Sequence, residues 1–147
     1  MRLFKVRYKY TLESNEVYEL GITFPNDIKL RFLTLSRSGR LEVFMGFGYD
    51  GPSGPTIDTK LFIWTSLPHD IIYLLIRLGL LPPEYRKIGD RLLRKMNLEG
   101  REENYLGNGL LRLKPMSRFR AWYVYELLRL GGGPAADPKN KKKVWEF

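Results

Sequence analysis

The order of patterns along the chain predicts an α+β fold, in which an N-terminal antiparallel β-meander is followed by three helices. Two observations lead to this prediction. Apolar and polar side chains alternate over residues 1–47, and apolar residues recur at helical spacing in three segments after residue 65. A chain of 147 residues, 44% hydrophobic, can bury one core. We therefore expect one α+β domain over 1–133 and a basic tail over 134–147.

Four alternating runs in the first part of the chain predict four strands. They cover residues 4–10, 18–24, 28–32 and 41–47. The segments between them are rich in the Ser, Asn, Asp, Pro and Gly residues that turns require. Short breaks of this kind favour hairpin connections, so we expect the four strands to form a single meander.

A glycine-rich segment follows the predicted strands. Residues 46–59 read GFGYDGPSGPTIDT, with no strand or helix period. We interpret the segment as a rigid, shaped loop. Its glycines allow several backbone carbonyls to point toward one position, and Asp50 and Asp58 add carboxylates.

Three helices are predicted in the second part of the chain. The first begins at Thr65 or Ser66, with Pro68 in its first turn, and ends at Gly79. The second starts at the proline pair 82–83 and ends near Gly100, and the third covers 118–130 after a Ser117 cap. The segment 101–115 receives no assignment.

Composition excludes several classes of protein. The absence of cysteine rules out disulfides, thiolate metal sites and cysteine nucleophiles. The apolar stretches are too short to cross a bilayer, and the first residues lack the apolar region of a signal peptide, so we expect neither a transmembrane segment nor a secretion signal. A net charge of +9 favours anionic lipid, acidic protein or nucleic acid as a partner. Nucleic acid is the weakest of the three, because no binding motif is present.

One polar dipeptide interrupts the apolar first helix. His69 and Asp70 lie among Leu, Ile and Pro residues, and His69 is the only histidine. His69 and Tyr73 share one helix face at i and i+4, whereas Asp70 points about 100° away. An imidazole held by a carboxylate on one nitrogen can act as a general base, and Asp90 on the second helix is a candidate for that carboxylate.

The same residues also allow a structural interpretation. A buried histidine that is satisfied by its neighbours is commoner than a catalytic one. The helical position of Asp90, beside Arg86 and Arg94, equally suits an exposed ion-pair residue. Ser53, between glycines and prolines, is typical of a turn.

Four motifs in order resemble those of a phage and prophage protein family of unknown function. They are YDGPSGPTID, SLPHDIIY, IGDRLLRKM and MSRFRAWYVYELLRLGGG, within about residues 44–133. The matching positions are Asp50, Ser53, Pro55, His69, Asp70, Tyr73, Asp90 and Arg91. This resemblance implies a bacteriophage protein that acts in the host cytoplasm or in the virion. The stretch 101–115 is longer than the family's connection.

A more distant similarity is to phospholipases A2, in which a glycine-rich calcium loop precedes a His-Asp-x-x-Tyr helix and a second helix supplies an Asp. The similarity implies that His69 activates water and that Asp90 and Tyr73 hold it. It also implies a Ca²⁺ site formed by Asp70, Asp50 and the carbonyls of the loop glycines, which are Gly48, Gly51 and Gly54. The chain departs from that pattern because it has no cysteines, a more distant loop and a preceding β-meander.

Two hypotheses of different classes follow. The chain is a hydrolase, acting as a calcium-dependent esterase, or it is a non-catalytic virion or assembly component in which His69, Asp70 and Asp90 form a buried polar network. The substrate and the virion partner stay open.

Overall fold

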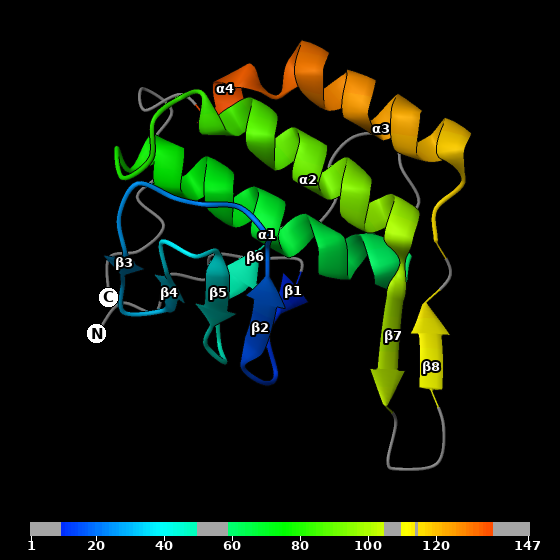
Figure 1. The fold of residues 1–147 in the computed structure, drawn as a ribbon, viewed down its shortest axis with the longest axis horizontal. Coiled ribbons are helices and arrows are strands. Elements are labelled where there is room, and N and C mark those ends of the chain that lie inside the picture. Colours follow the sequence, from blue (N-terminus) through cyan, green and yellow to red (C-terminus); the bar gives the residue numbers. More distant parts are fainter. Residues whose placement is uncertain (1–9, 50–58, 105–109, 114, 137–147) are drawn as a thin grey trace. The chain divides into compact units, whose positions relative to one another are not determined.

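The computed structural model describes residues 10–49, 59–104, 110–113 and 115–136 (Figure 1). It confirms the α+β fold, with antiparallel strands first and helices after them. Contacts divide the chain into two compact units, whose described parts are 10–49 and the segments from 59 to 136. The single domain expected over 1–133 stays a prediction.

Short antiparallel strands form two sheets in the first unit. One sheet has the order β2-β5-β4-β3, and β1 pairs with β6 in the other. The strands are β1 (Tyr10–Thr11), β2 (Glu16–Glu19), β3 (Ile28–Lys29), β4 (Leu33–Leu35), β5 (Arg40–Val43) and β6 (Gly48–Tyr49).

This topology corrects the predicted four-strand meander. The run 28–32 does not form one strand, because the chain turns between β3 and β4, with Leu30 N–H bonded to Leu33 carbonyl at 2.8 Å. The run 41–47 also divides, since Gly46 turns the chain with φ 92° and leaves Met45 exposed. β2 pairs with β5, so that Tyr18 lies opposite Leu41. Alternation identified the strands' buried faces but not their partners. The strand predicted at 4–10 lies outside the described residues except for Tyr10.

Three long helices form the second unit, as predicted. They are α1 (Lys60–Arg77), α2 (Tyr85–Glu99) and α3 (Arg118–Gly131), followed by a short α4 (Gly133–Ala136). The segment left unassigned contains a hairpin of β7 (Arg101–Asn104) and β8 (Leu110–Leu113). Figure 1 shows this hairpin projecting from the end of α2 and leading into α3.

The predicted start of the first helix is wrong. α1 begins at Lys60, where the Thr59 hydroxyl accepts a hydrogen bond from Phe62 N–H, and Pro68 lies inside the helix. The Ser66 hydroxyl donates instead to the Ile63 carbonyl one turn earlier, and the Thr65 hydroxyl lies 3.3 Å from the Phe62 carbonyl and 2.6 Å from Asn97 Oδ1 of α2. Residues that favour caps can satisfy themselves within a helix in this way, so they did not mark its start.

The other helix ends agree more closely with the sequence. α1 ends just before Gly79, and α2 ends at Gly100, both glycines with φ 74°. Ser117 caps α3 by accepting from Arg120 N–H at 3.2 Å. α2 begins at Tyr85, two residues after the proline pair.

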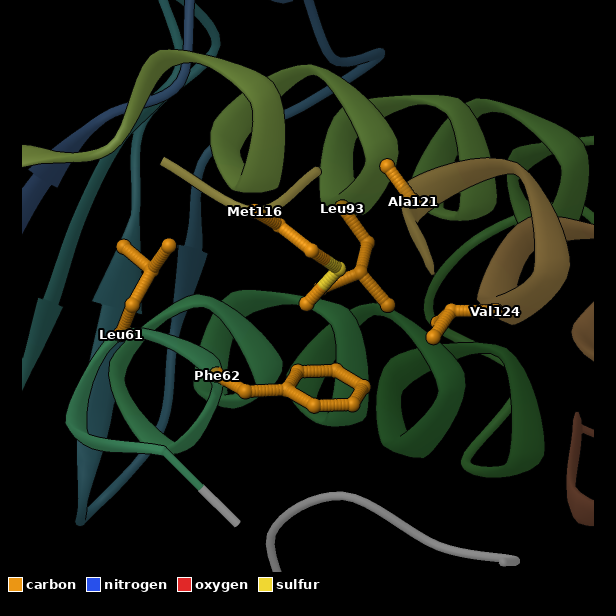
Figure 2. Close-up of a cluster of buried hydrophobic side chains, with 6 residues drawn as sticks. All are labelled: Leu61, Phe62, Leu93, Met116, Ala121 and Val124. Atoms are coloured by element: carbon orange, nitrogen blue, oxygen red, sulfur yellow. The ribbon is translucent and has the colours of Figure 1, made fainter. Parts of the chain in front are cut away.

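A cluster of apolar side chains joins the three helices (Figure 2). Its members are Leu61 and Phe62 of α1, Leu93 of α2, Met116, and Ala121 and Val124 of α3. Figure 2 shows Phe62, Leu93, Met116 and Val124 gathered between the helices, with Leu61 to one side. Burial of these side chains supplies the hydrophobic free energy that holds α1, α2 and α3 together.

Truncation of this core should destabilise the protein strongly. We expect Leu93→Ala to lower the free energy of unfolding by about 2–5 kcal/mol, because it leaves a cavity among three helices. The matched control is Leu98→Ala on the same helix, where Leu98 is exposed and the loss should stay within about 0.5 kcal/mol. Urea unfolding measures both, and equal small losses would contradict the observed packing.

Candidate functional site

Helix α1 presents His69 and Tyr73 on one buried face. They are one helical turn apart, and the centroids of their rings lie 4.3 Å from each other. Both side chains are nearly inaccessible to solvent, so their polar atoms require partners within the protein.

Asp90 of α2 supplies that partner. His69 Nε2 donates to Asp90 Oδ1 at 2.8 Å, and the Tyr73 hydroxyl donates to the same oxygen at 2.6 Å. The prediction that the imidazole lies within hydrogen-bonding reach of a carboxylate is therefore confirmed. Asp90 has no exposed surface, so its interpretation as an exposed ion-pair residue is wrong.

A third helix completes the partners of Asp90. Arg129 Nη1 of α3 donates to Asp90 Oδ2 at 2.8 Å. Arg129 was not predicted as a site residue, because it lies 39 residues from Asp90 in the chain and no local pattern relates the two. The one local feature that distinguishes Arg129 in the sequence is its position as the basic residue in the last turn of α3.

Arg86 fixes the end of α3 beside this network. Its Nη2 donates to the carbonyls of Leu128 and Arg129 at 2.6 and 3.1 Å. Gly132 follows, and a Cβ there would lie 2.7 Å from the Tyr73 hydroxyl. That contact is too close for any side chain, so glycine is required for α3 to end against Tyr73.

The environment shifts the pKa values of all three central groups. Burial works to lower the pKa of His69, but hydrogen bonds and charges from Asp70 and Asp90 together raise it. Burial works to raise the pKa of Asp90, and the bonds from His69, Tyr73 and Arg129 lower it nonetheless. Burial and the adjacent Asp90 raise the pKa of Tyr73. The network therefore favours imidazolium, carboxylate and neutral phenol.

Asp70 lies on the other side of the imidazole. Its Oδ1 is 3.5 Å from His69 Nδ1, and its side chain is 34% exposed. The two ring nitrogens therefore face different carboxylates, with Nε2 toward the buried Asp90 and Nδ1 toward the partly exposed Asp70. Of the two nitrogens, Nδ1 has the neighbour that solvent can reach.

The predicted cation ligands are only partly within the described residues. Asp70 belongs to the second unit, whereas Gly48 lies in β6 of the first, opposite Thr11. The remaining loop candidates, Asp50, Gly51, Ser53, Gly54 and Asp58, lie outside the described residues, as does Pro55. Within the described part of the chain, no three acidic, histidine or cysteine residues form a group that could hold a metal ion. The Ca²⁺ site stays a prediction.

Comparison of the chain with known protein families, with curated proteins and with solved structures finds no match. None of the helices in the described residues is long and apolar enough to span a membrane.

The raised pKa of His69 can be measured directly, since the chain has a single histidine. We expect an imidazole pKa above 6.5 in an NMR titration. Protonation then favours the native state, so this contribution to stability is present below pH 6.5 and is lost as the pH rises through the native pKa. Asp90→Asn should lower the pKa, and Glu99→Gln, an exposed carboxylate on the same helix, should leave it unchanged. A native value below 6.5 would contradict the observed network.

Removal of Arg129 tests whether the third helix stabilises Asp90. Arg129→Met should cost about 1–3 kcal/mol, because it removes a charged donor from a buried carboxylate. This loss of stability should be smaller than for a fully buried ion pair, since the Arg129 side chain is partly exposed. Arg118→Met, an exposed position on the same helix, is the control. Chemical denaturation should show a larger loss for Arg129, and equal losses would refute its role.

Proposed function

We propose that the chain is a phage-type hydrolase in which His69 takes a proton from water. One observation carries this proposal: Nε2 is fixed at 2.8 Å from the buried Asp90 carboxylate, while Nδ1 faces the partly exposed Asp70. When neutral imidazole donates its proton through Nε2, the lone pair lies on Nδ1. Asp90 and Tyr73 act as positioning residues, since they hold the ring in this orientation.

The four sequence motifs support a bacteriophage or prophage origin, with action in the host cytoplasm or the virion. Three residues of these motifs, His69, Tyr73 and Asp90, contact one another in the structure. That arrangement is also the one implied by the resemblance to phospholipases A2.

The proposed reaction is hydrolysis of a carboxylic ester. Water attacks the carbonyl carbon as its proton passes to His69 Nδ1, and a tetrahedral intermediate forms. The intermediate collapses as the bond to the leaving alkoxide breaks, and His69 returns the proton to that oxygen. The products are a carboxylic acid and an alcohol.

The proposed hydrolase includes a bound Ca²⁺ ion, for which Asp70 is a candidate ligand. Its partly exposed carboxylate is an oxygen ligand of the kind that Ca²⁺ prefers. When bound, the ion would polarise the ester carbonyl. With its charge shared in this way, Asp70 would also raise the pKa of His69 less, and neutral imidazole is the form that acts as a base.

A structural role is the second candidate, and burial favours it. His69, Tyr73 and Asp90 are at most 5% exposed, and with Arg129 they connect three helices. In a virion or assembly component the same network would fix the fold without any reaction.

Calcium and two substitutions separate the candidates. Calcium at a hundred times its dissociation constant should stabilise the native state by about 2.7 kcal/mol in thermal unfolding, and magnesium should do much less. Asp70→Asn should abolish this shift. His69→Asn should keep the shift but abolish release of fatty acid from a short-chain phosphatidylcholine supplied as monomers.

The alternative makes the opposite prediction for the same samples. If calcium leaves the melting temperature unchanged, and the wild-type protein releases no fatty acid, the hydrolase proposal fails. Destabilisation by His69→Asn would then reflect the loss of a structural network.

A further inference from the structure

The outer face of α3 carries large apolar side chains in solvent. Phe119 is 74% exposed, Trp122 55% and Leu130 84%. Ala121 and Val124, on the opposite face of the same helix, are buried in the core of the second unit. The helix is therefore apolar on both faces. Packing within the second unit accounts for the inner face but not for the outer one.

The three exposed residues lie on one side of the helix, and the partly exposed Glu126 lies among them, four residues from both Trp122 and Leu130. At about 100° per residue, Phe119, Trp122 and Leu130 fall within about 80° of one another around the helix axis. From Phe119 to Leu130 the three residues extend about 16 Å along the helix. An exposed apolar surface of this kind marks an interaction site more often than scattered single residues do.

Basic residues flank these three side chains. Arg118 and Arg120 lie about 100° to either side of Phe119, and Arg118 is exposed. The guanidinium of Arg120 lies 5.7 Å from the Phe62 ring centroid, at the edge of the core. Glu126 is the one acidic residue in the sequence of α3. Cations beside an aromatic and aliphatic face complement a surface that is apolar in depth and anionic at its rim.

We propose that this face of α3 binds the surface of an anionic phospholipid bilayer. Phe119, Trp122 and Leu130 would enter the boundary between headgroups and acyl chains, where Trp is favoured, while Arg118 and Arg120 contact lipid phosphates. The helix lies in the membrane plane and does not cross it. A net charge of +9 adds attraction to the same surface.

This inference goes beyond the proposed hydrolase and does not depend on it. His69 lies on α1, and the lipid-binding residues lie on the outer side of α3. Arg129 reaches Asp90 from α3, but within the described residues Phe119, Trp122 and Leu130 make no hydrogen bond or ring contact with His69, Tyr73 or Asp90. Membrane binding and ester hydrolysis can therefore fail separately.

Flotation with lipid vesicles tests the proposal on the full chain. We expect binding to vesicles of phosphatidylcholine mixed with phosphatidylglycerol, much weaker binding to phosphatidylcholine alone, and a decrease at high salt. The double variant Phe119→Gln with Leu130→Gln should bind at least about tenfold more weakly, since two apolar side chains no longer enter the bilayer. Arg118→Gln should reduce binding to the anionic vesicles only.

Matched variants distinguish this surface from apolar exposure in general. Met45→Gln and Leu98→Gln alter exposed apolar residues elsewhere and should bind as wild type. His69→Asn should also bind as wild type, so an inactive enzyme would still support this proposal. Absence of vesicle binding would overturn it. So would a dimer in light scattering that the Phe119 and Leu130 substitutions dissociate, because a second copy of the chain would then cover the face.

Discussion

The buried carboxylate of Asp90 is the constraint on which the helical unit depends. An ionised carboxylate without solvent costs several kcal/mol unless charged and hydrogen-bonding groups surround it. Its two oxygens receive His69 and Tyr73 from α1 and Arg129 from α3. Apolar packing around Leu93 tolerates some sliding of helices, whereas these bonds form at a single register. The network therefore fixes where α1 and α3 lie along α2.

The same constraint also suits the role of general base that we propose for His69. Fixing Nε2 against Asp90 determines the orientation of the ring and leaves Nδ1 directed to the side where Asp70 is accessible. A catalytic base needs this rigidity, and a structural network supplies it by the same bonds. The buried geometry is therefore compatible with both the catalytic and the structural role. Calcium binding and ester hydrolysis are the measurements that distinguish them.

Helix α3 has a buried inner face and an exposed apolar outer face. Its inner face supplies the core residue Val124, and Arg129 reaches Asp90 from the side of the helix, so α3 contributes to the stability of the unit. Its outer face leaves Phe119 and Trp122 exposed, so these side chains contribute little to the stability of the described unit. Substitutions on the outer face should therefore change association more than stability.

Local sequence determined the α+β class, the three helices, the glycine ends of α1 and α2, and the i, i+4 pairing of His69 with Tyr73. Each depends on residues within one or two turns, where periodicity and capping act. Tertiary structure decided the pairing of β2 with β5 and the burial of Asp90 against Arg129. These features depend on groups far apart in the chain. Their free energy appears only when the elements pack, so no local pattern of residues records it.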